Sequence, residues 1–152
     1  MKKNTFAPLI PILMTTASLP EVAHAEIIFD RDRVQAECTD KWATDFSMVK
    51  YCMDERKEGF DYFQKVHKIV ADIAGPTLDY CANKWGHKWD MTAYCTRENL
   101  DAMRSVPATT AGLPKETADR ILLDCSKKWQ PQWDMIAYCT GNQATAWKSI
   151  NN

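Results

Sequence analysis

The segment Cys81–Cys95 reads CANKWGHKWDMTAYC, and two other segments of the chain align with it without a gap. Cys38–Cys52 reads CTDKWATDFSMVKYC, and Cys125–Cys139 reads CSKKWQPQWDMIAYC. All three share the pattern Cys-x3-Trp-x5-Met-x2-Tyr-Cys, with a lysine before the tryptophan each time. Successive copies begin 43 and 44 residues apart. This period is typical of a two-helix unit rather than of a single helix or a pair of strands.

The spacing within each copy predicts two helices joined by a turn. The first cysteine and the tryptophan stand four residues apart, and after the turn Met, Tyr and Cys follow at i, i+3 and i+4, so each set shares one helical face. Gly86 and Pro131 interrupt the first helix of their copies. Ser47, Asp90 and Asp134 stand just before the second helix and are predicted to be its N-caps. Each copy is therefore predicted to be a short αα-hairpin.

All six cysteines belong to the three copies. An even number of cysteines in a small exported protein favours disulfides. An antiparallel hairpin brings its first and last cysteines together, so the predicted pairs are Cys38–Cys52, Cys81–Cys95 and Cys125–Cys139. Zinc ligation is the alternative, but the Cys-x13-Cys spacing lacks the close Cys-x2-Cys pair of structural zinc sites. We therefore expect disulfides, and neither a metal nor another cofactor.

Outside the copies the apolar pattern remains helical and shows no useful β-alternation. The second helix of the first copy is expected to end at Gly75-Pro76. The second copy's long helix is expected to stop before Val106-Pro107, and Pro114 is expected at the first position of the next helix. The sequence thus predicts an all-α fold of three disulfide-stapled αα-hairpin repeats stacked into one small helical domain. The predicted repeats span residues of about 30–75, 76–113 and 114–152.

The N-terminus has the three parts of a secretory signal peptide: Met1-Lys2-Lys3, an apolar run from Phe6 to Met14, and the cleavage sequence Ala23-His24-Ala25. Residues 1–25 are expected to be removed, so that the mature chain begins at Glu26. The apolar run is far shorter than the roughly 20 residues that span a bilayer, and we expect no transmembrane anchor after cleavage. The expected location is the bacterial periplasm or the extracellular space.

Charge and motifs exclude several function classes. The chain has 19 basic and 20 acidic side chains, a formal net charge of −1, and the two signs are mixed along every segment. A nucleic-acid-binding protein usually presents a basic face, so we expect no nucleic-acid partner. Nucleophile-elbow, HExxH and phosphate-loop motifs are missing from the mature sequence. The repeated residues are chiefly those that a stapled hairpin needs to fold, and we expect a protein that is not an enzyme.

Three columns of the repeat are expected to form the hairpin cores. Tryptophan supplies buried area and methionine fills gaps in such cores. A pocket for an apolar ligand or for Cu(I) is the alternative use of the same side chains. The core residues predicted on this basis are Trp42, Trp85, Trp129, Met48, Met91, Met135, Tyr51, Tyr94 and Tyr138.

The aromatic residues at the turns are the candidate binding residues. Phe46, Trp89 and Trp133 each stand just before the second helix, where an apolar residue often packs back on that helix as a hydrophobic staple. An exposed aromatic residue at a turn can instead anchor a partner. The staple is favoured, and partner contact stays open. His87 lies between Trp85 and Trp89, where it would suit ligand contact, and has no counterpart in the other copies.

The shared motif resembles short motifs of uncharacterised small bacterial and phage-associated secreted helical proteins, and this resemblance implies only a common hairpin design. The stapling is also similar to that of the twin-Cys helical hairpin proteins of the mitochondrial intermembrane space, whose cysteine spacing is shorter. We expect an exported binding or structural protein that contacts another protein or an envelope component. The alternatives are a small-molecule or glycan-binding protein that uses the turn aromatics, and an enzyme whose site the sequence hides.

Overall fold

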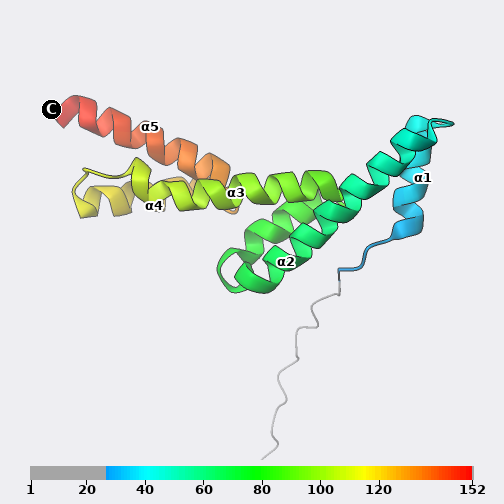
Figure 1. Cartoon of the computed structure of the whole chain (residues 1–152). Helices are drawn as coiled ribbons and strands as arrows, with labels where there is room; N and C mark the ends of the chain where they lie inside the picture. The colour runs from blue at the N-terminus through cyan, green and yellow to red at the C-terminus, as the bar shows by residue number, and fades with distance from the viewer. Residues whose placement is uncertain (1–26, 152) are drawn as a thin grey trace, which may run out of the picture.

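The computed structural model describes residues 27–151, and within this range the chain has five α-helices and no strand (Figure 1). The helices are α1 (Arg31–Trp42), α2 (Phe46–Trp85), α3 (Trp89–Thr109), α4 (Lys115–Trp129) and α5 (Trp133–Asn151). The predicted all-α fold is confirmed. The predicted signal peptide and the predicted mature N-terminus lie outside the described residues. None of the described helices is both long and apolar enough to cross a membrane.

Each copy of the repeat is a hairpin closed by one disulfide. The three pairs are Cys38–Cys52, Cys81–Cys95 and Cys125–Cys139, with Cα atoms 5.8, 5.7 and 5.8 Å apart. The turns between the paired helices are short, at residues 43–45, 86–88 and 130–132. The predicted connectivity is therefore confirmed, and no cysteine of the described chain is free. We call the units the first, second and third hairpins in chain order.

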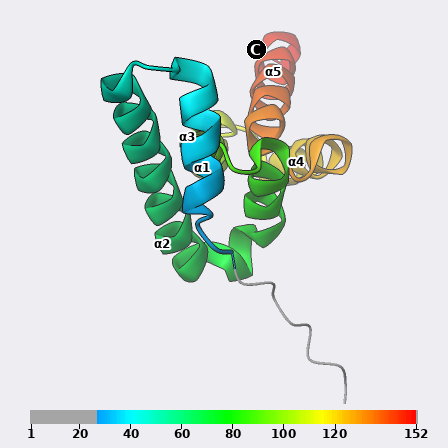
Figure 2. The same ribbon diagram turned by 90° about the vertical axis from the view of Figure 1, so that its right-hand side faces the viewer.

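Helix α2 continues through Gly75-Pro76, where the sequence predicted that it would end. It is not straight, because Phe60 and Phe63 share one packed cluster with Leu78. In a straight helix, a rise of 1.5 Å per residue would place Phe63 and Leu78 roughly 22 Å apart. Figure 2 shows the teal and green arms of α2 meeting in a sharp bend. We attribute the bend to Pro76, because proline lacks an N–H donor and its ring clashes with the preceding turn.

The other predicted helix ends differ by a few residues. Helix α3 extends through Pro107 to Thr109 instead of stopping before Val106. Pro114 occupies the N-cap position of α4, one residue before the predicted place. The predicted repeat boundary between residues 75 and 76 falls inside α2, so the first and second hairpins share this helix.

The predicted N-caps lie inside their helices. Asp45 caps α2, since its carboxylate accepts a hydrogen bond from the Met48 backbone N–H at 3.1 Å, and the Ser47 hydroxyl donates to the same carboxylate. The helices begin at the turn aromatics, which places Asp90 and Asp134 in the first turns of α3 and α5. Acidic side chains there still interact favourably with the helix dipole.

The buried face of each second helix begins one residue later than the sequence predicted. Tyr51, Tyr94 and Tyr138 are 57%, 56% and 67% exposed, so the predicted tyrosine core column is wrong. The residues buried instead are Val49, Thr92 and Ile136, which are 8%, 0% and 0% exposed. The predicted tryptophan and methionine columns are half-buried. A shift of one residue along an α-helix is a rotation of about 100°, which is enough to turn the tyrosines away from the first helix of their hairpin.

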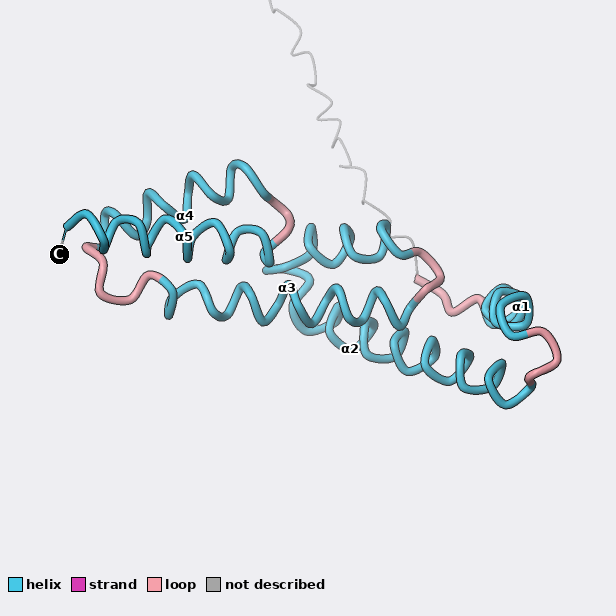
Figure 3. The backbone as a smooth tube through the Cα atoms, turned by 90° about the horizontal axis from the view of Figure 1, so that it is seen from above, coloured by secondary structure: helices cyan, strands magenta, loops and turns pink. Residues whose placement is uncertain are grey.

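The helices form an elongated body. Figures 1 and 3 place α1 at one end and the pair α4–α5 at the other, with α3 reaching from α2 to α5. The largest apolar cluster lies at the bend of α2 and contains Phe60, Phe63, Leu78 and Trp89. The turn between α1 and α2 and the far end of α4–α5 therefore lie at opposite ends of the molecule.

Candidate functional site

The turn of the second hairpin packs into the first hairpin. The Trp89 ring lies 5.0 Å from the Phe60 ring and 5.6 Å from the Phe63 ring, centroid to centroid, and Trp89 is only 5% exposed. Gly59 permits this approach, because a Cβ at Gly59 would lie 2.3 Å from the Trp89 carbonyl oxygen. Trp89 therefore packs on the preceding hairpin and not on its own helix as a staple. Its burial also removes it as an exposed binding anchor.

A buried arginine links three helices at the same contact. Arg56 on α2 is 8% exposed and forms an ion pair with Glu37 on α1. Its Nε also lies 3.9 Å from Oδ1 of Asp90 on α3. The hydrogen bond from the Arg56 guanidinium holds the pKa of Glu37 below its ordinary value of 4.5. The contact between the first two hairpins thus combines the aromatic packing of Trp89 with the ion pairs of Arg56.

The turn of the third hairpin contacts the second hairpin at an equivalent place, through hydrogen bonds and with Trp133 half-buried. Asn99 and Asp134 occupy the repeat positions of Arg56 and Asp90, and they again touch each other. Three hydrogen bonds hold the contact: Asp134 N–H to Asn99 Oδ1 at 3.3 Å, Tyr80 hydroxyl to Gln132 Oε1 at 3.1 Å, and Thr77 hydroxyl to the Pro131 carbonyl at 2.8 Å. A turn therefore docks on the equivalent face of the preceding hairpin twice within the described chain, with different interactions each time.

The third hairpin has the corresponding groove, and no turn of the described chain packs into it. Helices α4 and α5 enclose an open volume of about 590 Å³. We call this the α4–α5 groove. Its lining residues are Glu116, Thr117, Arg120, Ile121, Gln143, Ala146, Trp147, Ser149 and Ile150.

The repeat alignment places the α4–α5 groove at the position of the surfaces that receive the second and third turns. Five of its lining residues align with residues of the first hairpin: Ile121 with Val34, Gln143 with Arg56, Ala146 with Gly59, Trp147 with Phe60, and Ile150 with Phe63. The last four of these residues of the first hairpin lie against Trp89 or Asp90. The exposed fraction of the last aligned residue is low in the two hairpins that receive a turn and high in the third. Phe63 is 0% exposed, Val106 in the second hairpin is 5% exposed, and Ile150 is 80% exposed.

The first turn is the counterpart of the open groove. Phe46 aligns with Trp89 and Trp133, yet it is 75% exposed, whereas Trp133 is half-buried. Within residues 27–151, no hairpin precedes the first one to receive its turn. Of the three predicted turn aromatics, Phe46 alone stands out into solvent as a binding anchor would.

His87, the other candidate binding residue, does not belong to a metal-binding cluster of the described residues. It lies in the turn between α2 and α3, is half-buried, and its Nδ1 atom is buried without a hydrogen-bond partner in the structure. Among the described residues, no three His, Cys, Asp or Glu side chains come close enough together to hold a metal ion. The described part of the structure therefore gives His87 no group of side chains with which it could bind a metal ion.

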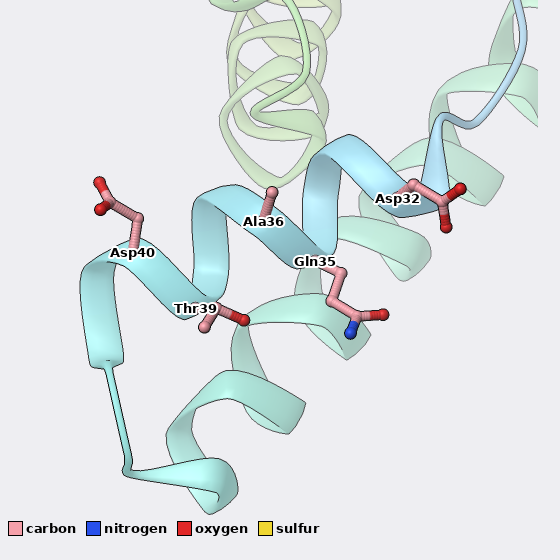
Figure 4. A pocket seen from close by; sticks show the side chains of 5 residues that line it. All are labelled: Asp32, Gln35, Ala36, Thr39 and Asp40. Carbon is pink, nitrogen blue, oxygen red and sulfur yellow. The ribbon is translucent and has the colours of Figure 1, made fainter.

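Two further hollows lie elsewhere on the surface. Figure 4 shows the first, about 510 Å³, where side chains from α1 alone, among them Asp32 and Asp40, spread along the helix without converging. The second, about 160 Å³, is bounded by Trp85, Tyr94 and Lys84, whose Nζ lies 5.5 Å from the Trp85 ring centroid. The lysine–tryptophan pair of the second hollow recurs at Trp42 and Trp129. Neither hollow, however, is equivalent to a surface that receives a turn elsewhere in the described chain, so the α4–α5 groove is the better candidate site.

Sequence reasoning did not identify the residues of the α4–α5 groove. The motif ends at the second cysteine, whereas Gln143, Ala146 and Trp147 follow it. Carrying the repeat offset past that cysteine aligns them with their counterparts, but their shared role depends on a contact between hairpins. Comparison of the chain with protein-family models, with curated proteins and with solved structures gives no match.

Proposed function

We propose that this chain is an exported binding or structural protein without catalytic activity, which acts through macromolecular contacts in the periplasm or extracellular space. The contact surface of this proposal is the α4–α5 groove. The observation that carries it is the groove's equivalence to two grooves that are filled by hairpin turns within the same chain. A groove of this kind has the shape and chemistry to receive a protein turn.

The composition of the groove supports a protein partner. Trp147 and Ile150 supply apolar surface, and Ile150 is 80% exposed. Gln143 stands at the position where Arg56 and Asn99 hold the acidic residue of the docked turn. An apolar anchor with a polar partner beside it is a common composition of protein–protein contacts.

Two features support an oxidising compartment. Three disulfides close the hairpins, and such bonds persist mainly in exported proteins. The basic, apolar and Ala-x-Ala sections of residues 1–25 are those of a secretory signal. Export to the periplasm or the medium is the location that both features favour.

Site-specific photo-crosslinking tests the proposal. A photo-reactive residue is placed at Ile150 in the full chain, and a matched control carries it at Ile73, which is 72% exposed on α2 and does not line the groove. We expect a discrete crosslinked product in the exported fraction from position 150 and none from position 73. No product at 150, or identical products from both positions, would refute binding at the groove.

A further inference from the structure

The two ends of the molecule carry the two halves of the docking contact that the chain uses internally. The first turn presents Phe46, 75% exposed. The α4–α5 groove presents Trp147 and Ile150 at the positions of Phe60 and Phe63, which receive Trp89. Figures 1 and 3 place this turn and this groove at opposite ends of the elongated body.

From this geometry we infer that copies of the chain associate head to tail, with the Phe46 turn of one copy seated in the α4–α5 groove of the next. The inference deepens the proposed function, on which it rests, by naming a second copy as the partner. A contact between two different surfaces of the same protein is heterologous. Because the two surfaces lie at opposite ends, such contacts build an open chain of copies rather than a closed pair.

The alignment predicts the register of this junction. Phe46 takes the place of Trp89 and Trp133, against Ala146, Trp147 and Ile150. Ser47 takes the place of Asp90 and Asp134. In the two internal contacts these residues lie beside Arg56 and Asn99, and the equivalent residue of the groove is Gln143, so Ser47 faces Gln143 in the junction. A serine hydroxyl and a glutamine amide can donate to and accept from each other, so the pair needs no charge. Ala146 stands at the position of Gly59, whose close contact is with the backbone of Trp89. The equivalent residue of the second hairpin is Ala102, so the third turn already packs on a hairpin that carries alanine at this position.

The junction between copies is weaker than the internal contacts. The register sets Asp45 near Asp124, as Gln132 lies near Tyr80, and two carboxylates repel each other. Arg120 also lines the groove and supplies the opposite charge. The internal contacts moreover form within one chain, where the effective concentration of the partner is high. Association is therefore expected to appear only as protein concentration rises.

Sedimentation velocity of the oxidised, full-length mature protein over a concentration series tests the inference. We expect the weight-average sedimentation coefficient of the wild type to increase with concentration. Phe46→Asp and Ile150→Asp should each remain monomeric over the same series. Both residues are exposed, so circular dichroism should show unchanged helicity. Ile69→Asp, at another apolar residue that is 70% exposed, is the matched control and should associate like the wild type.

Mixing the two variants identifies the junction. Phe46→Asp keeps an intact groove and Ile150→Asp keeps an intact turn, so an equimolar mixture can form one junction per pair and no longer chain. We expect dimers in the mixture and monomers in each variant alone. A wild type that stays monomeric at its solubility limit, or variants that associate as the wild type does, would overturn the inference. A crosslink from Ile150 to a different protein would also overturn it while leaving the proposed function intact.

Discussion

Replacing Gly59 with alanine tests the close contact that joins the first two hairpins. Alanine is favoured over glycine within a helix by about 1 kcal/mol. At this position, however, the new Cβ would lie 2.3 Å from the carbonyl oxygen and 2.5 Å from the carbonyl carbon of Trp89. These are backbone atoms, so the helices must separate and loosen the packing of Trp89 on Phe60. Overpacking of this kind costs about 1–3 kcal/mol, and more where backbone must move. We expect a net destabilisation of about 2 kcal/mol.

Gly141→Ala is the matched control, because Gly141 also lies inside a helix but no atom lies within 4 Å of the Cβ that alanine would add. This variant should be more stable than the wild type by about 0.5–1 kcal/mol. Urea unfolding of the oxidised proteins, followed by circular dichroism and tryptophan fluorescence, measures both changes. The thermal midpoint of Gly59→Ala should decrease by roughly 5–10 °C. Equal or higher stability of Gly59→Ala would refute the close packing of Gly59 on Trp89.

Three further predictions concern the staples, pH and the turn aromatics. Peptide mapping should recover the three hairpin disulfides, and replacing Cys81 and Cys95 together with alanine should cost about 3 kcal/mol in urea unfolding, as expected for a loop of about 15 residues. Glu37 has a lowered pKa in the fold, so its ion pair stabilises the protein above the ordinary carboxyl pKa and is lost as pH falls through the folded-state value. Glu37→Gln should therefore reduce stability at pH 7 and narrow the difference in urea midpoint between pH 7 and pH 3, and an unchanged difference would contradict this. Trp89→Ala should lower stability by about 3–5 kcal/mol, whereas Phe46→Ala should change it by less than about 0.5 kcal/mol. Thermal unfolding at low protein concentration checks both, and similar losses would contradict the assigned environments.

The repeated docking mode explains why equivalent residues have different environments. Phe46 and Trp89 occupy the same place in their hairpins, but only Trp89 has a hairpin before it in the described chain. Phe63 and Ile150 also occupy equivalent places in their hairpins. Phe63 is buried because a further hairpin turn packs against it, whereas no turn of the described chain packs against Ile150. Repeat proteins generally need distinct terminal units, because a terminal repeat has a neighbour on one side only. Within residues 27–151, the first and third hairpins instead retain exposed apolar residues, Phe46 and Ile150, whose equivalents in the contacts between hairpins are more buried.

Local features of the hairpins were predicted well because they depend on residues close in the sequence. Cys81 and Cys95 are separated by 14 positions, and the turn between them is set by Gly86, whose φ is +54°. Helix periodicity and disulfide pairing both follow from such short separations. The tyrosine column was predicted wrongly, although it belongs to the same motif. The column that faces the first helix is Val49, Thr92 and Ile136. Because Thr92 is polar, the three copies do not share an apolar residue at this position, and the repeat pattern pointed to the tyrosines instead.

An all-α chain of three hairpins and the pairing of the six cysteines could be predicted from the sequence, because period, spacing and turn chemistry act within one hairpin. Three features could not be predicted this way: α2 bends and continues at Pro76, Trp89 is buried while Phe46 is exposed, and Ile150 borders an open groove. These outcomes depend on contacts between hairpins. The contact of Gly59 with Trp89 joins residues 30 positions apart, and neither residue's own surroundings in the sequence reveal the other.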